Sequence, residues 1–180
     1  MHARSQSPVP EAAGAAAAGP SAFDTLFLAE YSRVVAVANR VLGDRAEAED
    51  VAQEVLWDFH RRHPNGHPRP GGWLHSAAVH TALNRIRGRR RRERTEFRHG
   101  LHTEDAPDPA RTYEQSEQRR LVREALARLP ERKAAVLALR YAGLSYAEVA
   151  TALGVGIGQV GTLLRRAESL MLKEVTRVAP

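Results

Sequence analysis

The chain has 180 residues, of which 43% are hydrophobic, so it has room for one modest domain or two small helical ones. Its net charge of +6 favours a polyanionic partner, and nucleic acid is the leading class. The absence of cysteine excludes disulfides, thiolate zinc sites and cysteine nucleophiles, and no stretch approaches the ~20 apolar residues that cross a bilayer.

The first segment, residues 1–20, is rich in Ala, Pro, Ser and Gly, a composition typical of a disordered tail without a function of its own. No basic segment leads into a leucine-rich core here, so a signal peptide is not expected. We therefore expect a cytoplasmic protein that does not insert into a membrane.

Three helices are predicted between residues 21 and 94. The first begins at Ser21, which forms a capping-box pattern with Asp24, and ends at Gly43. The second begins at Asp44, and its apolar residues recur at helical spacing. Prolines and glycines make residues 63–72 a predicted loop, after which a third helix runs over 73–94.

An acidic linker is predicted over residues 95–112, where helical periodicity is lost and prolines alternate with Asp and Glu. Helical patterns return over 113–175, with Pro130 separating two helices and Gly143 ending the second. No segment alternates like a strand. The predicted fold is all-α, with a three-helix N-terminal domain (21–94), the linker, and a four-helix C-terminal domain (113–175).

The strongest local pattern is a helix-turn-helix over residues 143–167. Ser145 and Glu148 form a second capping box, and Gly154 suits the left-handed position that ends a helix. In such a motif the second helix enters the DNA major groove. Base or phosphate contacts are therefore expected from its outward residues: Gln159, Thr162, Arg165 and Arg166. The alternative is a plain helical hairpin with a solvated polar face.

The third helix ends in a basic run, because seven of the residues 84–94 are arginine. Such crowding repels itself unless a polyanion lies alongside, although a solvated helix end is the alternative interpretation. Upstream, Trp73, His80 and Asn84 are positioned to stack on or hydrogen-bond to unpaired bases. Trp73 is as well explained as a core residue.

The second helix has the opposite charge. Around Trp57 it carries acidic and amide side chains: Glu47, Glu49, Asp50, Gln53, Glu54 and Asp58. An acidic surface repels DNA, so it is either a docking site for a basic partner protein or simply a solvated face.

Taken together, the motifs resemble those of the extracytoplasmic-function (ECF) sigma factors. The resemblance covers about residues 21–175 and lies in segments 44–55, 72–74, 78–84, 129–132, 145–150 and 153–155. It implies two conserved domains, sigma-2 and sigma-4, and promoter DNA and core RNA polymerase as partners. It also implies that an anti-sigma factor is a further candidate partner, and we expect a monomer when the chain is free.

The resemblance assigns three groups of site residues. Those expected to bind core polymerase, at the β′ coiled coil and with the β subunit as a further contact, are Glu49, Asp50, Gln53, Glu54 and Trp57. Those expected to recognise and melt the −10 promoter element are Trp73, His80, Asn84, Arg85, Arg87 and Arg89. Those expected to bind the −35 element are Gln159, Thr162, Arg165 and Arg166. The linker is expected to pass through the polymerase cleft near the RNA path.

Three positions depart from the family pattern. His80 stands where many relatives carry Asn, Gly161 where they commonly carry Lys or Arg, and Leu163 where Arg is frequent. We expect weakened −35 contacts or contacts shifted to the outward residues of that helix, with Leu163 at a protein interface or against thymine methyl groups.

Three other functions were weighed. A metal site from His60, His63 and His67, with His75 and His80 further on, lacks enough ligands at the required spacing, so no metal or other cofactor is expected. No phosphate-binding glycine loop or nucleophile motif is present, so no catalytic residue and no enzyme activity is expected. A stand-alone helix-turn-helix regulator would explain the C-terminal half but not the acidic helix.

Overall fold

In the computed structural model the described residues, 21–98 and 113–178, fold into seven helices and no strands, so the predicted all-α class is confirmed. The helices are α1 (Ala22–Leu42), α2 (Arg45–Arg62), α3 (Pro70–Arg98), α4 (Tyr113–Arg128), α5 (Glu131–Tyr141), α6 (Tyr146–Leu153) and α7 (Ile157–Val178). The predicted tail over 1–20 and residues 99–112 of the predicted linker lie outside the described residues.

Local hydrogen bonds account for the helix ends. Both predicted capping boxes are present: the Ser21 hydroxyl accepts from the Asp24 amide at the start of α1, and Ser145 and Glu148 repeat the arrangement at α6. Gly43 and Gly154 end α1 and α6 in the left-handed conformation, with φ of 66° and 61°. Glycine suits these positions because it has no Cβ to clash there.

Two predicted boundaries were wrong. The third helix begins at Pro70 instead of Trp73, because a proline at the first helical position lacks an N–H that would have no partner there anyway. It also continues to Arg98, past its predicted end at residue 94. The last helix, α7, is a single helix of 22 residues.

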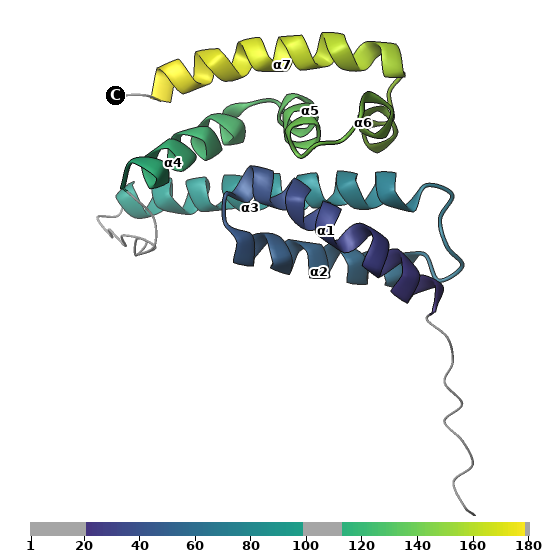
Figure 1. The fold of residues 1–180 in the computed structure, drawn as a ribbon. Coiled ribbons are helices and arrows are strands. Elements are labelled where there is room, and N and C mark those ends of the chain that lie inside the picture. The colour runs from purple at the N-terminus through teal and green to yellow at the C-terminus, as the bar shows by residue number, and fades with distance from the viewer. Residues whose placement is uncertain (1–20, 99–112, 179–180) are drawn as a thin grey trace, which may run out of the picture.

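The helix α3 lies in the middle of the molecule (Figure 1). One side of it packs on α1 and α2, and another side contacts α4, α5 and α6. The buried residues form one continuous core cluster that runs through both halves, and Leu74 and Leu83 of α3 are fully buried in it. Burying each such leucine stabilises the fold by roughly 1.5–3 kcal/mol.

The helix α7 forms the outer layer on the opposite side from α1 and α2, against α4, α5 and α6 (Figure 1). Among the described residues no single helix is long and apolar enough to span a membrane. Only α6 and α7 taken together are long and apolar enough, and the chain bends by 88° between these two helices.

Candidate nucleic-acid interface

One side of the basic end of α3 is paired with the acidic helix α2. The Arg85 guanidinium donates to a Glu54 carboxylate oxygen at 2.8 Å and to the Glu47 carbonyl at 3.4 Å. Arg89 forms an ion pair with the Glu47 carboxylate. Arg85, which is predicted to bind DNA, therefore contacts Glu54, which is predicted to bind polymerase, within the chain.

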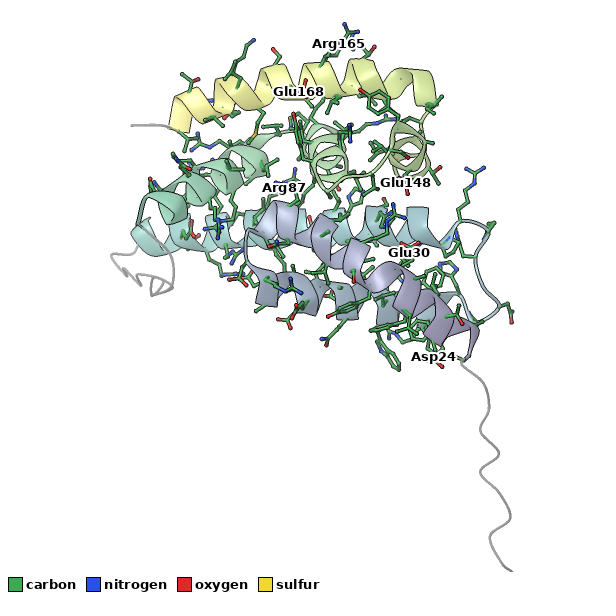
Figure 2. All side chains as sticks on the ribbon, viewed as in Figure 1. Asp24, Glu30, Arg87, Glu148, Arg165 and Glu168 are labelled. Atoms are coloured by element: carbon green, nitrogen blue, oxygen red, sulfur yellow. The ribbon has the colours of Figure 1, made fainter. Side chains whose placement is uncertain are left out.

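A second side of α3 is covered by the junction of α4 and α5. His80 contacts the Glu131 carboxylate, and Arg87 lies 3.9 Å from the same group. Arg87 also donates to the Leu129 carbonyl at 3.0 Å, and its side chain points toward this junction (Figure 2). Asn84, on the same helix, remains exposed.

The N-terminal turns of α3 lie close to α6. A Cβ at Gly72 would stand 2.6 Å from the Thr151 methyl carbon, so only glycine permits this approach. Nearby, Arg33 of α1 forms an ion pair with Glu148 of α6. The Arg33 hydrogen bond, together with those from the Ser145 amide and hydroxyl, lowers the pKa of Glu148 to about 2.

A buried histidine lies beside this contact. His75 Nε2 is 2.9 Å from a carboxylate oxygen of Glu30, and only 2% of the residue is exposed. Burial lowers the pKa of His75, and the Glu30 charge opposes that effect. Figure 2 shows Glu30 and Glu148 on facing elements in this region.

Trp73 lies in the aromatic core of the N-terminal half instead of on its surface. Its ring meets Phe59 edge-on at 5.4 Å and His63 at 5.3 Å between centroids. It is half-buried. These contacts support the alternative, that Trp73 is a packing residue, more than a role in stacking on an unpaired base.

The outer face of α2 is only partly available. Asp50 and Gln53 are exposed, and Trp57 is 60% exposed, unusually high for tryptophan. Glu49 pairs with Arg45 one turn earlier, at 2.8 Å. An exposed aromatic ring among acidic groups has the composition of a protein-docking surface.

The outer face of α7 carries all four residues predicted there. Gln159, Thr162, Arg165 and Arg166 are exposed, and Arg165 projects away from the rest of the molecule (Figure 2). Thr162, Arg165 and Arg166 line a shallow hollow with Lys133 of α5, and no carboxylate lines it. Lys133 was not predicted from the sequence as part of this surface, although its place in the first turn after Pro130 could have indicated it.

The unusual residues of α7 face inward. A Cβ at Gly161 would meet the Tyr146 ring at 3.7 Å, and Leu163 is half-buried against the core. Gln159 is engaged locally, because its side-chain oxygen accepts from the Gly156 amide at 3.2 Å. Thr162, Arg165 and Arg166 are therefore the predicted residues whose side chains form no hydrogen bond or ion pair within the described parts of the chain.

Two of the histidines considered for a metal site, His63 and His67, lie close together. The His63 and His67 rings are 4.8 Å apart and pack against Phe59. Within residues 21–98 and 113–178, no group of three or more His, Cys, Asp or Glu side chains is arranged to hold a metal ion.

Two family models match the chain. The model of sigma-70 region 2 matches residues 26–92, and the model of sigma-70 region 4 matches residues 119–171. The first match covers most of α1, α2 and α3, and the second covers most of α4 to α7.

Several curated proteins are similar along most of their length. The RNA polymerase sigma-H factor of Pseudomonas aeruginosa is 32% identical, with 84% of this chain and 85% of that protein covered. The ECF RNA polymerase sigma factor SigL of Mycobacterium tuberculosis is 32% identical, covering 90% and 95%. The ECF sigma factor SigE of Mycolicibacterium smegmatis is 34% identical, covering 87% of this chain and 62% of that protein.

A solved structure shares the fold. The sigma factor RpoE of Bartonella quintana, crystallised in complex with the anti-sigma factor NepR, has a TM-score of 0.53 and 19% identity. The similarity covers 86% of this chain and 96% of that one.

Proposed function

The chain belongs to the extracytoplasmic-function sigma factors, and from that premise we propose how its surfaces divide promoter and polymerase binding. It is an alternative sigma factor that directs transcription initiation by RNA polymerase. Proteins of this family are initiation factors and are not known as enzymes.

We propose that α7 binds the −35 element through Thr162, Arg165 and Arg166, with Lys133 on the adjoining phosphates. The observation that supports this is the exposed basic hollow that these four residues line without a carboxylate. Arginine contacts guanine or phosphate in a bidentate manner, and lysine supplies a point charge to phosphate. Gln159 joins this group only if its bond to the Gly156 amide opens.

The proposed −10 surface is α3, from His80 to Arg89. Its residues Asn84, Arg85, Arg87 and Arg89 offer a hydrogen-bonding amide and three cations to unpaired bases and phosphates. All three cations are engaged in the described arrangement: Arg85 and Arg89 by α2, and Arg87 by the junction of α4 and α5. Contact of the −10 element with His80 and Arg87 therefore requires the C-terminal half to move away from α3, whereas Arg85 and Arg89 must open their pairs with α2.

The proposed polymerase surface is the exposed face of α2, with Asp50, Gln53 and Trp57 at its centre. Glu49 and Glu54 join it at the edge, although they pair with Arg45 and Arg85. We assign this face to the β′ coiled coil, with the β subunit as a further contact. Acidic groups around an exposed aromatic ring suit a basic partner surface.

We also propose a protein inhibitor as a partner. The RpoE structure was obtained with the anti-sigma factor NepR. A protein of that kind would find the exposed faces of α2 and α7 to bind on this chain.

We propose two domains that follow the division between polymerase and −10 binding on one side and −35 binding on the other. The N-terminal unit runs from 21 through α3, and the C-terminal unit from 113 to 175.

Run-off transcription with core RNA polymerase and genomic fragments tests the proposal. We expect promoter-specific transcripts from the complete chain, weakened by Asp50→Ala with Trp57→Ala and unchanged by Glu117→Ala, which removes a local pair with Arg120 on α4. Specific duplex binding by the chain alone, with no transcript from core polymerase, would favour a stand-alone regulator instead.

A further inference from the structure

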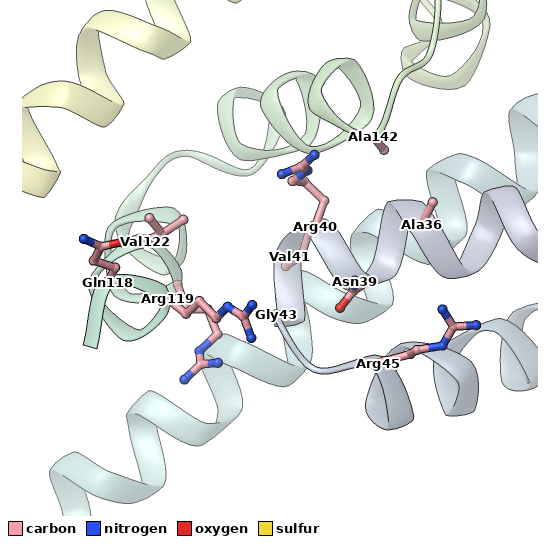
Figure 3. A pocket seen from close by; sticks show the side chains of 11 residues that line it. Ala36, Asn39, Arg40, Val41, Gly43, Arg45, Gln118, Arg119, Val122 and Ala142 are labelled. Carbon is pink, nitrogen blue, oxygen red and sulfur yellow. The ribbon is translucent and has the colours of Figure 1, made fainter. Parts of the chain in front are cut away.

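A hollow of about 690 Å³ lies between the two halves of the molecule, at the end of α1 and beside α4 (Figure 3). Its polar walls come from both halves: Asn39, Arg40 and Arg45 on one side, and Gln118, Arg119 and Arg123 on the other. We propose that this hollow binds a phosphorylated small molecule of nucleotide size.

The charge of the hollow supports an anionic ligand. Four arginines line it and no aspartate or glutamate does. Within the described parts of the chain, neither Arg40 nor Arg119 forms an ion pair, whereas Arg45 pairs with Glu49. Like charges held around one hollow repel each other, and a bound anion removes that repulsion.

A second basic hollow shows that this charge pattern is not general. Between α3 and α4, a smaller hollow is lined by Arg89, Arg90, Arg120 and Arg123 together with Glu93 and Glu124. Carboxylates there compensate the cations. The hollow at the end of α1 has no carboxylate in its lining, so the charges of Arg40 and Arg119, which form no ion pair within the described residues, are available to a ligand.

The geometry suits phosphate groups in particular. Arginine presents a planar fork of donors that matches phosphate oxygens in pairs. Arg123 also donates to the Leu42 carbonyl at 3.2 Å, which places its positive charge at the C-terminal end of α1. It thereby offsets the negative end of the α1 dipole, which would otherwise repel an anion.

The size and apolar walls favour more than bare phosphate. Ligand sites of about 300–1,000 Å³ hold molecules of nucleotide size. Apolar side chains, Val41 and Val122 with Ala36 and Ala142, complete the lining. They can cover a flat organic group while the arginines hold its phosphates.

A ligand in this hollow would touch both halves of the chain. Arg40 of α1 and Arg45 of α2 line one side of it, and Arg119 and Arg123 of α4 line the other, so binding would favour the joined arrangement over the separated one. The binding itself does not depend on the proposed DNA contacts, so a failure of either proposal can be recognised separately.

The test is binding to the purified complete chain at constant ionic strength, measured by calorimetry and by thermal unfolding. The probes are inorganic tripolyphosphate, ATP and adenosine. We expect saturable binding of the two phosphate compounds with a raised Tm, and none of adenosine. The double variant Arg40→Ala/Arg119→Ala should weaken binding by at least ~10-fold, because it removes two charge-assisted contacts.

The matched control is Arg69→Ala, which removes an exposed arginine from the loop before α3 and should leave binding within about twofold. Tighter binding of ATP than of tripolyphosphate would identify a nucleotide, and equal binding would identify the phosphates alone. Three results would overturn the proposal. The first is no saturable rise in Tm beyond that caused by sodium chloride, and the second is an equal loss of binding in the control variant. The third is displacement of tripolyphosphate by an acidic peptide or a DNA duplex that binds more tightly.

Discussion

The helices α3 and α7 both carry arginines suited to nucleic acid, but they use them differently in the described arrangement. On α3, Arg85 and Arg89 pair with α2, and Arg87 contacts the junction of α4 and α5. On α7, Arg165 and Arg166 are exposed beside Lys133, with no carboxylate lining their hollow. The difference indicates that the proposed −35 surface on α7 is exposed in the described arrangement, whereas the arginines of the proposed −10 surface on α3 are engaged within the chain.

This asymmetry follows from position in the fold. The middle layer, α3, is contacted on several sides, so its cations find carboxylates and carbonyls within the chain. The outer layer, α7, packs an inward stripe centred on Val160, Leu164 and Ala167 and leaves its opposite face exposed. Similar basic helices therefore have opposite accessibility because of what packs on them.

The largest expected effect is on −35 binding. Arg165→Ala with Arg166→Ala should weaken binding of polymerase holoenzyme to a −35 duplex by roughly 10- to 100-fold and reduce its salt dependence, because two charged contacts are lost. Filter binding or fluorescence anisotropy across a salt series measures this. The control is Lys173→Ala with Arg177→Ala, which removes the same charge near the far end of α7. Equal losses in both variants would rule out a localised contact.

The next effect concerns the close approach of α3 and α6. Gly72→Ala should lower the free energy of unfolding by ~1–3 kcal/mol, since its Cβ would overlap the Thr151 methyl carbon. Thr151→Ser removes that methyl and keeps the hydroxyl, so it should restore part of the loss. Gly158→Ala, with open space around its Cβ, is the control and should be neutral or stabilising. Urea denaturation of Gly72→Ala, Thr151→Ser, the double variant Gly72→Ala/Thr151→Ser and Gly158→Ala measures the coupling between the two positions. Its absence would mean that the two helices do not meet in solution.

A smaller effect is expected from uncovering α3. Glu131→Gln removes the carboxylate that contacts both His80 and Arg87, so the isolated chain should bind a single-stranded −10 oligonucleotide about 2- to 10-fold more tightly. Glu117→Gln makes the same charge change in a pair confined to α4. Unchanged affinity in Glu131→Gln, measured by anisotropy, would contradict the covering of α3 by α5.

The smallest effect is on acid stability. Arg33 and Ser145 hold the pKa of Glu148 at about 2, below its ordinary 4.5, so its stabilisation is complete above pH 4.5 and is lost as the pH falls toward 2. The Glu148 side chain is 37% exposed, and solvent screening keeps the effect small. The Tm of Glu148→Gln should be lower than that of the unmodified chain at pH 7, and the difference should shrink as the pH falls through 4.5 toward 2. A constant difference in Tm between the two proteins over the whole pH range would rule out the ion pair.

Local features of the fold were predictable from the sequence because their causes are local. The capping residues Ser21 and Ser145 and the left-handed Gly43 and Gly154 each act within one helical turn. The outward position of Arg165 and Arg166 follows from the inward stripe of α7. The family assignment used the same short motifs.

The pairing of surfaces was not predictable, because it depends on residues far apart in the chain. Nothing local indicates that Glu131 contacts His80, that Arg33 meets Glu148, or that Glu47 neutralises Arg89. Trp73 was ambiguous for the same reason, since its partners Phe59 and His63 belong to α2 and the loop that follows. Helical periodicity identifies a buried side of α3 but not which element covers each remaining side.

The distance between the halves, measured with and without polymerase, tests the central claim most directly. Because the chain has no cysteine, Ser32→Cys on α1 and Ser169→Cys on α7 provide two exposed sites for spin labels. We predict one short distance in the isolated chain and a longer one in a promoter complex with core polymerase that produces transcript. The same short distance in the transcribing complex would contradict the claim that α3 must be uncovered to bind the −10 element.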